Sequence, residues 1–172
     1  MRPTSSSSPS TAPSVLVIGV GNRYRSDDAA GLEAVRILRN QGLRAAEFEG
    51  EPIGLLDIWE GAGFAIVIDA VSSGADAGTI QRLDATVEPL PASVAGAPST
   101  HAVGLGQAIE LGRALGRLPG KLIVYGIEGD SFTAGEELSP RVAEALKSLV
   151  EQVHHEVLHT ADGGAEGPTD DA

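Results

Sequence analysis

Adjacent carboxylates near the start of the chain stand where acid–base or metal chemistry is commonly found. Asp27 and Asp28 follow a β-branched run over residues 15–20 and a glycine turn, and they open an apolar helical pattern. In open α/β folds, ligands bind where a strand ends in a loop that feeds a helix. Two carboxylates there indicate a cation or acid–base chemistry rather than a bound phosphate, which they would repel.

Two further segments supply a third carboxylate and an imidazole. Asp69 lies near the end of the apolar run F-A-I-V-I-D-A-V, where a buried carboxylate is costly unless it is paired or ligated. His101, in P-S-T-H-A-V-G-L, begins a predicted helix, and the positive end of a helix favours the neutral imidazole that binds metals. Asp28, Asp69 and His101 therefore predict a three-ligand site suited to zinc or nickel, at which the ion would activate water for hydrolysis.

Each of these residues also has a structural interpretation. Ser26 or Asp27 would cap the first helix, with Asp28 complementing its dipole. Asp69 would accept backbone N–H bonds from the turn at 72–74, and His101 would be an ordinary first-turn residue. The combination of three such groups on three separate loops favours the functional interpretation.

Composition and motifs exclude several classes of function. The chain has 172 residues, a net charge of −12 and no cysteine, so disulfides, thiolate zinc sites and cysteine nucleophiles are absent. The negative charge disfavours binding to nucleic acid and anionic lipid. No apolar run approaches the ~20 residues of a membrane span. A cytoplasmic location is expected. No H-E-x-x-H or G-x-S-x-G motif is present, since Ser131 lacks the second glycine. A dinucleotide fingerprint fails because Tyr24 occupies its third glycine position.

Alternating apolar patterns predict a three-layer α/β/α sandwich with a mostly parallel sheet, as in phosphorylase- and hydrolase-like α/β folds. The predicted strands are 15–20, 43–48, 64–71, 78–83 and 122–127, with 78–83 antiparallel to its predecessor. The predicted helices are 27–40, 53–59, 101–118 and 139–158, and residues 85–100 form a loop. Residues 1–14 are expected to be a disordered leader, 15–159 a single domain, and 160–172 a disordered acidic tail.

The motifs, in their order and spacing, resemble one known family. They are G-V-G-N-R-Y-R-S-D-D-A-A-G, E-G-E-P-I-G, V-I-D-A-V-S-S-G-A-D-A-G-T-I, S-T-H-A-V-G-L, Y-G-I-E-G-D-S-F and E-L-S-P-R-V, spread over residues 15–153. Together they resemble the hydrogenase maturation proteases, the nickel-dependent endopeptidases of the HybD/HycI type. That family removes a C-terminal extension from the large-subunit precursor of NiFe hydrogenase after nickel insertion.

The resemblance implies roles for individual residues. Asp28, Asp69 and His101 match the metal-contacting and catalytic positions, with nickel carried by the precursor rather than bound tightly by the protease. Either the metal or a carboxylate, as in an aspartyl protease, would activate water. Asn22, Asp27 and Glu49 are expected along the substrate edge.

The resemblance also implies a monomer whose partner is the hydrogenase precursor. Glu49 stands where the family commonly has Asp, and Glu51 where it has a small residue, which would alter selectivity for the partner. The alternatives are a non-catalytic chaperone of the precursor and a nucleotide-binding enzyme.

Overall fold

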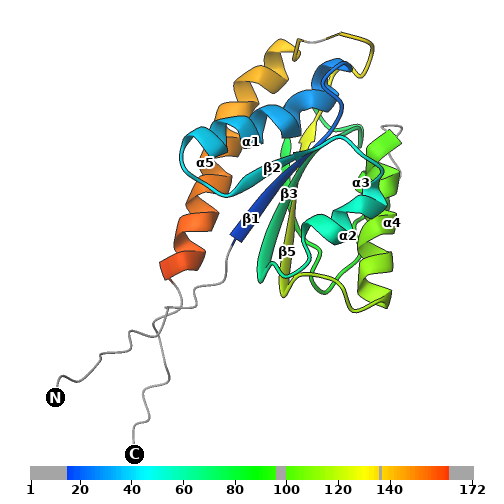
Figure 1. The fold of residues 1–172 in the computed structure, drawn as a ribbon. Helices are drawn as coiled ribbons and strands as arrows, with labels where there is room; N and C mark the ends of the chain where they lie inside the picture. The colour runs from blue at the N-terminus through cyan, green and yellow to red at the C-terminus, as the bar shows by residue number, and fades with distance from the viewer. Residues whose placement is uncertain (1–14, 96–99, 136, 163–172) are drawn as a thin grey trace, which may run out of the picture.

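In the computed structural model, a five-stranded sheet with the strand order β2-β1-β3-β5-β4 forms the middle layer (Figure 1). The structure describes the backbone of residues 15–95, 100–135 and 137–162, and the side chains of these ranges except 95, 100–103, 161 and 162. The strands are β1 (Val15–Val20), β2 (Ala45–Phe48), β3 (Phe64–Val71), β4 (Ile80–Asp84) and β5 (Lys121–Glu128). Neighbouring strands are parallel except for β4, which runs antiparallel to β5.

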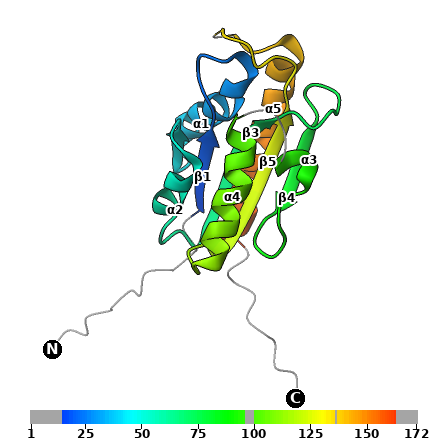
Figure 2. The same cartoon turned by 90° about the vertical axis from the view of Figure 1, so that its right-hand side faces the viewer.

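Helices cover both faces of this sheet, which confirms the predicted α/β/α sandwich. α1 (Ala30–Asn40) and α5 (Pro140–Asp162) lie together on one face. α2 (Leu55–Ile58), α3 (Ala92–Ala95) and α4 (Thr100–Ala114) cover the other face (Figures 1 and 2). Two 3-10 turns, η1 (Ser26–Ala29) and η2 (Pro52–Gly54), precede α1 and α2.

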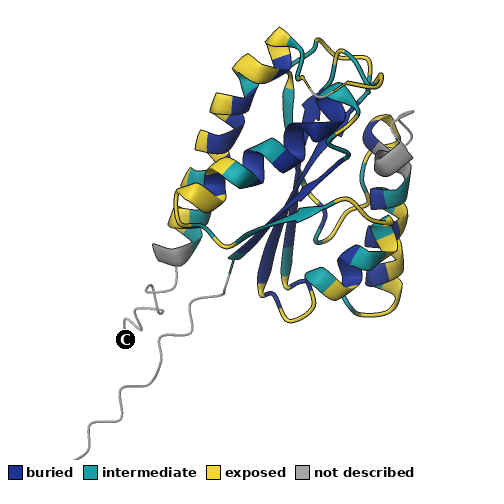
Figure 3. Ribbon diagram, turned by 45° about the horizontal axis from the view of Figure 1, so that its top comes forward, coloured by how far each residue is buried: buried dark blue, intermediate teal, exposed yellow. Residues whose placement is uncertain are grey.

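The central strand β3 divides its side chains between two cores. Phe64, Ile66 and Ile68 pack with α1 and α5, whereas Ala65 and Val67 pack with α2 and α4. Each fully buried large apolar side chain contributes roughly 1.5–3 kcal/mol to folding. The buried strands form the middle of the molecule in Figure 3. Because side chains alternate along a strand, Asp69 faces the α4 layer, as Ala65 and Val67 do.

One predicted strand pairing is wrong. The segment expected to lie beside 64–71 forms β4, which pairs with β5 through contacts such as Ile80↔Ile127. β3 already has β1 on one side and β5 on the other, so both of its hydrogen-bonding edges are used. The segment after β3 therefore does not fold back on β3 as a hairpin. It forms the edge strand β4 beside β5.

Several predicted element boundaries also differ. α4 ends at Ala114, before Gly116 adopts a positive φ of 65°, so Leu115 is exposed instead of facing inward. α3 forms within the expected loop at 85–100. α5 continues to Asp162, past the predicted helix end at residue 158.

The predicted leader, 1–14, and residues 163–172 of the predicted tail lie outside the described residues. Within the described ranges, no helix combines the length and apolar character needed to cross a membrane.

Candidate active site

Close backbone contacts bring the start of the first helical segment against the ends of β1 and β3. A Cβ atom on Gly21 would lie 1.9 Å from the carbonyl oxygen of Asp28. A Cβ on Gly31 would lie 2.4 Å from the carbonyl oxygen of Ile68. These glycines allow η1 and α1 to pack on the strands without intervening side chains, which places Asp28 beside the strand end that carries Asp69.

The two carboxylates of Asp28 and Asp69 form the centre of the site. Both residues are fully buried. Burial and the neighbouring Asp28 carboxylate raise the pKa of Asp69 well above its usual value. Among the residues that the structure describes, no group makes a well-formed hydrogen bond to either carboxylate oxygen of Asp69, and the Ala70 backbone N–H offsets the raised pKa only in part. The surroundings therefore favour either a proton or a cation at Asp69, and both options are useful for hydrolysis.

Glu128 performs the structural task that the sequence also allowed for Asp69. This buried residue at the end of β5 accepts hydrogen bonds from the backbone N–H and hydroxyl of Ser73, at 2.8 and 2.7 Å. It also accepts a bond of 3.0 Å from the N–H of Gly74. The turn after β3 is thus fastened by Glu128. Glu128 was not among the residues predicted from the sequence, although its place at the end of an apolar strand resembles that of Asp69.

Asp27 has a structural role, which corrects the prediction that it lies on the substrate edge. One carboxylate oxygen accepts bonds from the N–H groups of Asp130 and Ser131, at 2.8 and 2.9 Å, and from the Ser139 hydroxyl, at 2.9 Å. The other oxygen accepts a bond of 2.7 Å from the Ser139 N–H. The side chain is fully buried and fastens the β5–α5 loop to η1. It does not cap η1, which has no side-chain cap.

Asn22 and Glu49 lie in the loops after β1 and β2. The Asn22 side-chain oxygen accepts a bond of 2.9 Å from the Tyr24 N–H. Glu49 is exposed and pairs with the Arg23 guanidinium, whose Nε donates a bond of 2.8 Å. This hydrogen bond from Arg23 lowers the pKa of Glu49. Both residues border the carboxyl edge of the sheet, and their contact with a substrate stays a prediction.

His101 belongs to the first turn of α4, and its side chain lies outside the described residues. α4 leads into β5, which is parallel to β3, so α4 begins at the same sheet edge where Asp69 stands. Leu105 and Ile109 of α4 join Val67 in one core cluster on the face of the sheet that Asp69 shares. Among the described side chains, no three His, Asp or Glu groups form a metal-binding cluster. The predicted set of metal ligands therefore depends on His101, whose side chain is not among those described.

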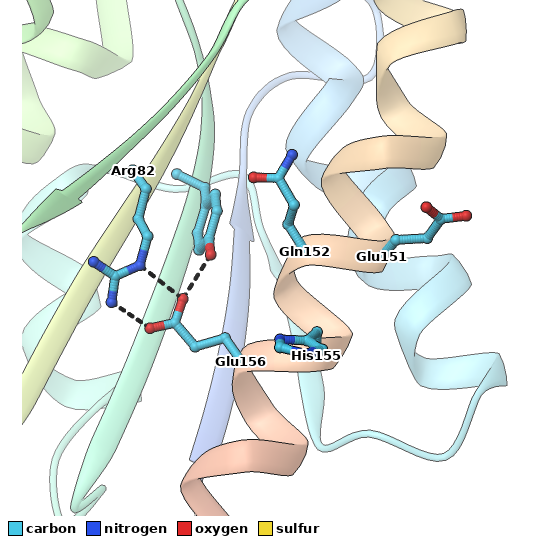
Figure 4. Close-up of a pocket in the computed structure, with 6 residues that line it drawn as sticks. Arg82, Glu151, Gln152, His155 and Glu156 are labelled. Carbon is cyan, nitrogen blue, oxygen red and sulfur yellow. Dashed lines mark hydrogen bonds and ion pairs between the residues drawn. The ribbon is translucent and has the colours of Figure 1, made fainter.

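A separate cavity of about 530 Å³ lies between β4, β5 and α5 (Figure 4). On its wall, Glu156 accepts a hydrogen bond of 3.0 Å from Arg82 and one of 2.6 Å from the Tyr125 hydroxyl. Burial opposes ionisation of Glu156, but these bonds outweigh it and lower the pKa of that carboxyl. Since the three groups satisfy one another, this cluster ties the sheet edge to α5 and offers no reactive group.

The amino-acid sequence matches known proteins over most of its length. A family model for hydrogenase maturation protease matches residues 51–156. The hydrogenase expression/formation protein HupD of Thiocapsa roseopersicina is 29% identical over 149 residues, covering 81% of this chain and 65% of HupD. The hydrogenase 2 maturation protease of Escherichia coli is 30% identical over 145 residues, covering 81% of this chain and 87% of that protein.

Solved structures agree with the sequence comparison. The hydrogenase maturating endopeptidase HybD of E. coli superposes with a TM-score of 0.72 at 27% identity, covering 85% of this chain and 93% of HybD. The NiFe hydrogenase maturation protease HybD of Thermococcus kodakarensis superposes with a TM-score of 0.69 at 29% identity, covering 83% and 97% of the two chains. This chain therefore belongs to the hydrogenase maturation protease family, and it is a peptidase.

Proposed function

We propose that this peptidase removes the C-terminal extension from the large-subunit precursor of a NiFe hydrogenase after nickel has been inserted. The observation that carries the proposal is the buried pair of Asp28 and Asp69 at the carboxyl edge of the sheet, in a chain of this family. A relative that is 30% identical is named a maturation protease of hydrogenase 2, which supports a hydrogenase precursor as the partner. We place this reaction in the cytoplasm and assign it to a monomer.

In the proposed reaction, Asp69 contacts the nickel of the precursor and Asp28 acts as the base. The raised pKa of Asp69 favours a protonated carboxyl in the free protease, and that proton would be released when the carboxylate contacts the nickel. Asp28, in its ionised form, would accept a proton from the attacking water. As the C–N bond breaks, Asp28 would transfer this proton to the leaving amine, so charge and atoms balance.

Nickel enters this proposal as part of the substrate. Carboxylate oxygen and imidazole nitrogen are ligands that nickel accepts, and no described residue makes a well-formed hydrogen bond to the Asp69 oxygens. We propose that Asp28, Asp69 and His101 contact the nickel of the precursor and so orient the peptide bond to be cut. Differential affinity for the loaded over the empty precursor would then set specificity.

A processing assay tests the proposal. Purified protein is mixed with nickel-loaded or nickel-free large-subunit precursor, and the intact masses are followed. Loss of a C-terminal peptide from the loaded precursor alone is the expected result. The His101→Ala variant should remain folded and fail to process. Binding without cleavage by the wild-type chain would instead identify a chaperone of the precursor, and normal processing by His101→Ala would refute the proposed site.

A further inference from the structure

An open groove of about 490 Å³ lies between the segment after β2 and the helix α4. One wall is formed by Glu51, Pro52 and Ile53, and the other by Gly104, Gln107 and Leu111. The volume suits one or two side chains of an extended peptide and lies in the usual range for ligand pockets.

The groove is mixed in character, with exposed apolar side chains on both walls and a contact that holds the walls together. Ile53 is 55% exposed and Leu111 is 37% exposed, although both are large hydrophobic side chains. A Cβ atom on Gly104 would lie 2.3 Å from Cγ of Pro52, so η2 and α4 touch at that point. The walls are therefore held together where the Pro52 ring packs on the backbone of Gly104, while the Ile53 and Leu111 side chains remain available to a partner.

The groove begins near the same edge of the sheet as the proposed active site. Gly104 lies one helical turn after His101 on α4. On the other wall, η2 follows β2, whose last residue, Phe48, is paired with Val20 at the end of β1. Both walls thus begin at the carboxyl edge of the sheet, where Asp28 and Asp69 lie. A peptide held at that edge can continue into the groove.

Glu51 gives the groove a charge preference. Its carboxylate is exposed and forms no ion pair with any described residue, in contrast to nearby Glu49, which is paired with Arg23. The overall charge of −12 adds to the negative potential at this edge. A groove with exposed apolar side chains and an unpaired carboxylate at its rim complements a segment in which a basic side chain stands beside an apolar one.

From this complementarity we infer that the groove between η2 and α4 holds the C-terminal segment of the hydrogenase precursor next to the scissile bond. An apolar side chain of that segment lies between Ile53 and Leu111, and a neighbouring basic side chain pairs with Glu51. This inference rests on the proposed function and deepens it, because it adds a recognition surface that acts in addition to the nickel.

Kinetics of paired variants test the inference with the full-length chain and nickel-loaded precursor. Glu51→Lys should raise KM about fivefold, with kcat changed less than about twofold. Leu111→Ser should raise KM about tenfold. The matched controls, Glu144→Lys and Leu158→Ser, alter an exposed acid and an exposed leucine of α5 and should leave both constants unchanged. Unchanged KM values in both groove variants would overturn the inference.

Photo-cross-linking decides the occupant without requiring cleavage. Benzoylphenylalanine is placed at Ile53, or at Leu158 as a control, and cross-linked peptides are identified by mass spectrometry. The inference predicts cross-links from Ile53 to the precursor's C-terminal segment and none from Leu158. Cross-links to a second copy of this chain, to another region of the precursor, or to nothing would overturn it. Cross-links to the expected segment without cleavage by the wild-type chain would contradict the proposed function and still support the groove.

Discussion

Asp27 and Asp69 are both fully buried acids, but their surroundings have opposite effects on the charged form. Asp27 accepts four hydrogen bonds, which stabilise its carboxylate. Asp69 stands beside the Asp28 carboxylate, and among the described residues none makes a well-formed hydrogen bond to its oxygens, so the weak opposing effect of the Ala70 N–H does not prevent the raised pKa. Asparagine at each position, which removes the charge with little change in shape, should therefore change stability in opposite directions.

Asp69→Asn should stabilise the protein at and above neutral pH. Since the folded pKa of Asp69 is raised, its favourable contribution exists at low pH and is lost as the pH rises through that folded pKa. Asparagine cannot ionise, so the variant avoids that loss. We expect a gain of at least about 1 kcal/mol at pH 8 and a smaller gain at pH 5, measured by urea unfolding. A variant less stable than the wild type at both pH values would contradict this account of Asp69.

Asp27→Asn should destabilise the protein by about 1–3 kcal/mol. An amide places an N–H group against the N–H donors of Asp130 and Ser131 or of Ser139, which leaves buried donors without an acceptor. Urea unfolding at pH 7 measures the change. The matched control, Asp76→Asn, alters an exposed aspartate and should change stability by less than about 0.5 kcal/mol. Equal stabilities of the Asp27 and Asp76 variants would show that the four bonds contribute little.

The sequence distinguishes these acids only in part. Asp69 could be selected because it follows a continuous apolar strand, and the carboxyl ends of parallel strands meet at one edge. Asp27 and Asp28 are adjacent, so their sequence context is nearly the same. The partners that fix Asp27 lie more than a hundred residues away, with Asp130 at a separation of 103. Those contacts depend on the tertiary structure and have no local sequence signal.

At the scale of elements, the packing of α1 on the sheet depends on glycine. The Cβ atom of an alanine at position 31 would lie 2.4 Å from the Ile68 carbonyl oxygen and 2.5 Å from that of Val20. Both obstacles are backbone atoms of central strands, so a change of rotamer cannot relieve the clash. The start of α1 and η1 would have to move away from β1 and β3, and Asp28 would move with it.

Gly31→Ala should therefore destabilise the protein by about 3 kcal/mol or more, the range for overpacking against a rigid core. It should also reduce processing in the molecules that remain folded, because the distance between Asp28 and Asp69 changes. Thermal unfolding and the mass-based assay at a temperature well below the transition measure the two effects separately. Wild-type stability in this variant would contradict the close approach of α1 to the strands.

The positions of the strands in the sequence could be predicted better than the pairing of the strands in the sheet. The runs at 15–20 and 64–71 are apolar apart from Asp69 because helices cover both of their faces, and the structure has these strands at the same residues. β4 is amphipathic, so its pattern indicates a strand but not its partner. Its place beside β5 follows from the two occupied edges of β3, which is a property of the assembled sheet.

At the scale of the whole molecule, the sandwich brings segments that are distant in the chain to one edge. Four segments meet there: the η1 turn, the end of β3, the start of α4 and the β5–α5 loop (Figure 1). Hydrogen bonds to Asp27 join η1 to the β5–α5 loop. Buried acids with different tasks are thus held within a small region. The structural acids, Asp27 and Glu128, lie in the same region as Asp69, whose burial makes its charge costly, as expected where function is placed above stability.

The central claim is that the Asp28–Asp69 pair performs the cleavage. The most direct measurement is an intact-mass time course with nickel-loaded precursor, using the wild-type chain and the Asp69→Asn variant side by side. We predict release of the C-terminal peptide by the wild type, and a rate reduced at least about a hundredfold for the variant, despite its higher stability. Cleavage by the variant at the wild-type rate would contradict the assignment of this pair as the catalytic centre.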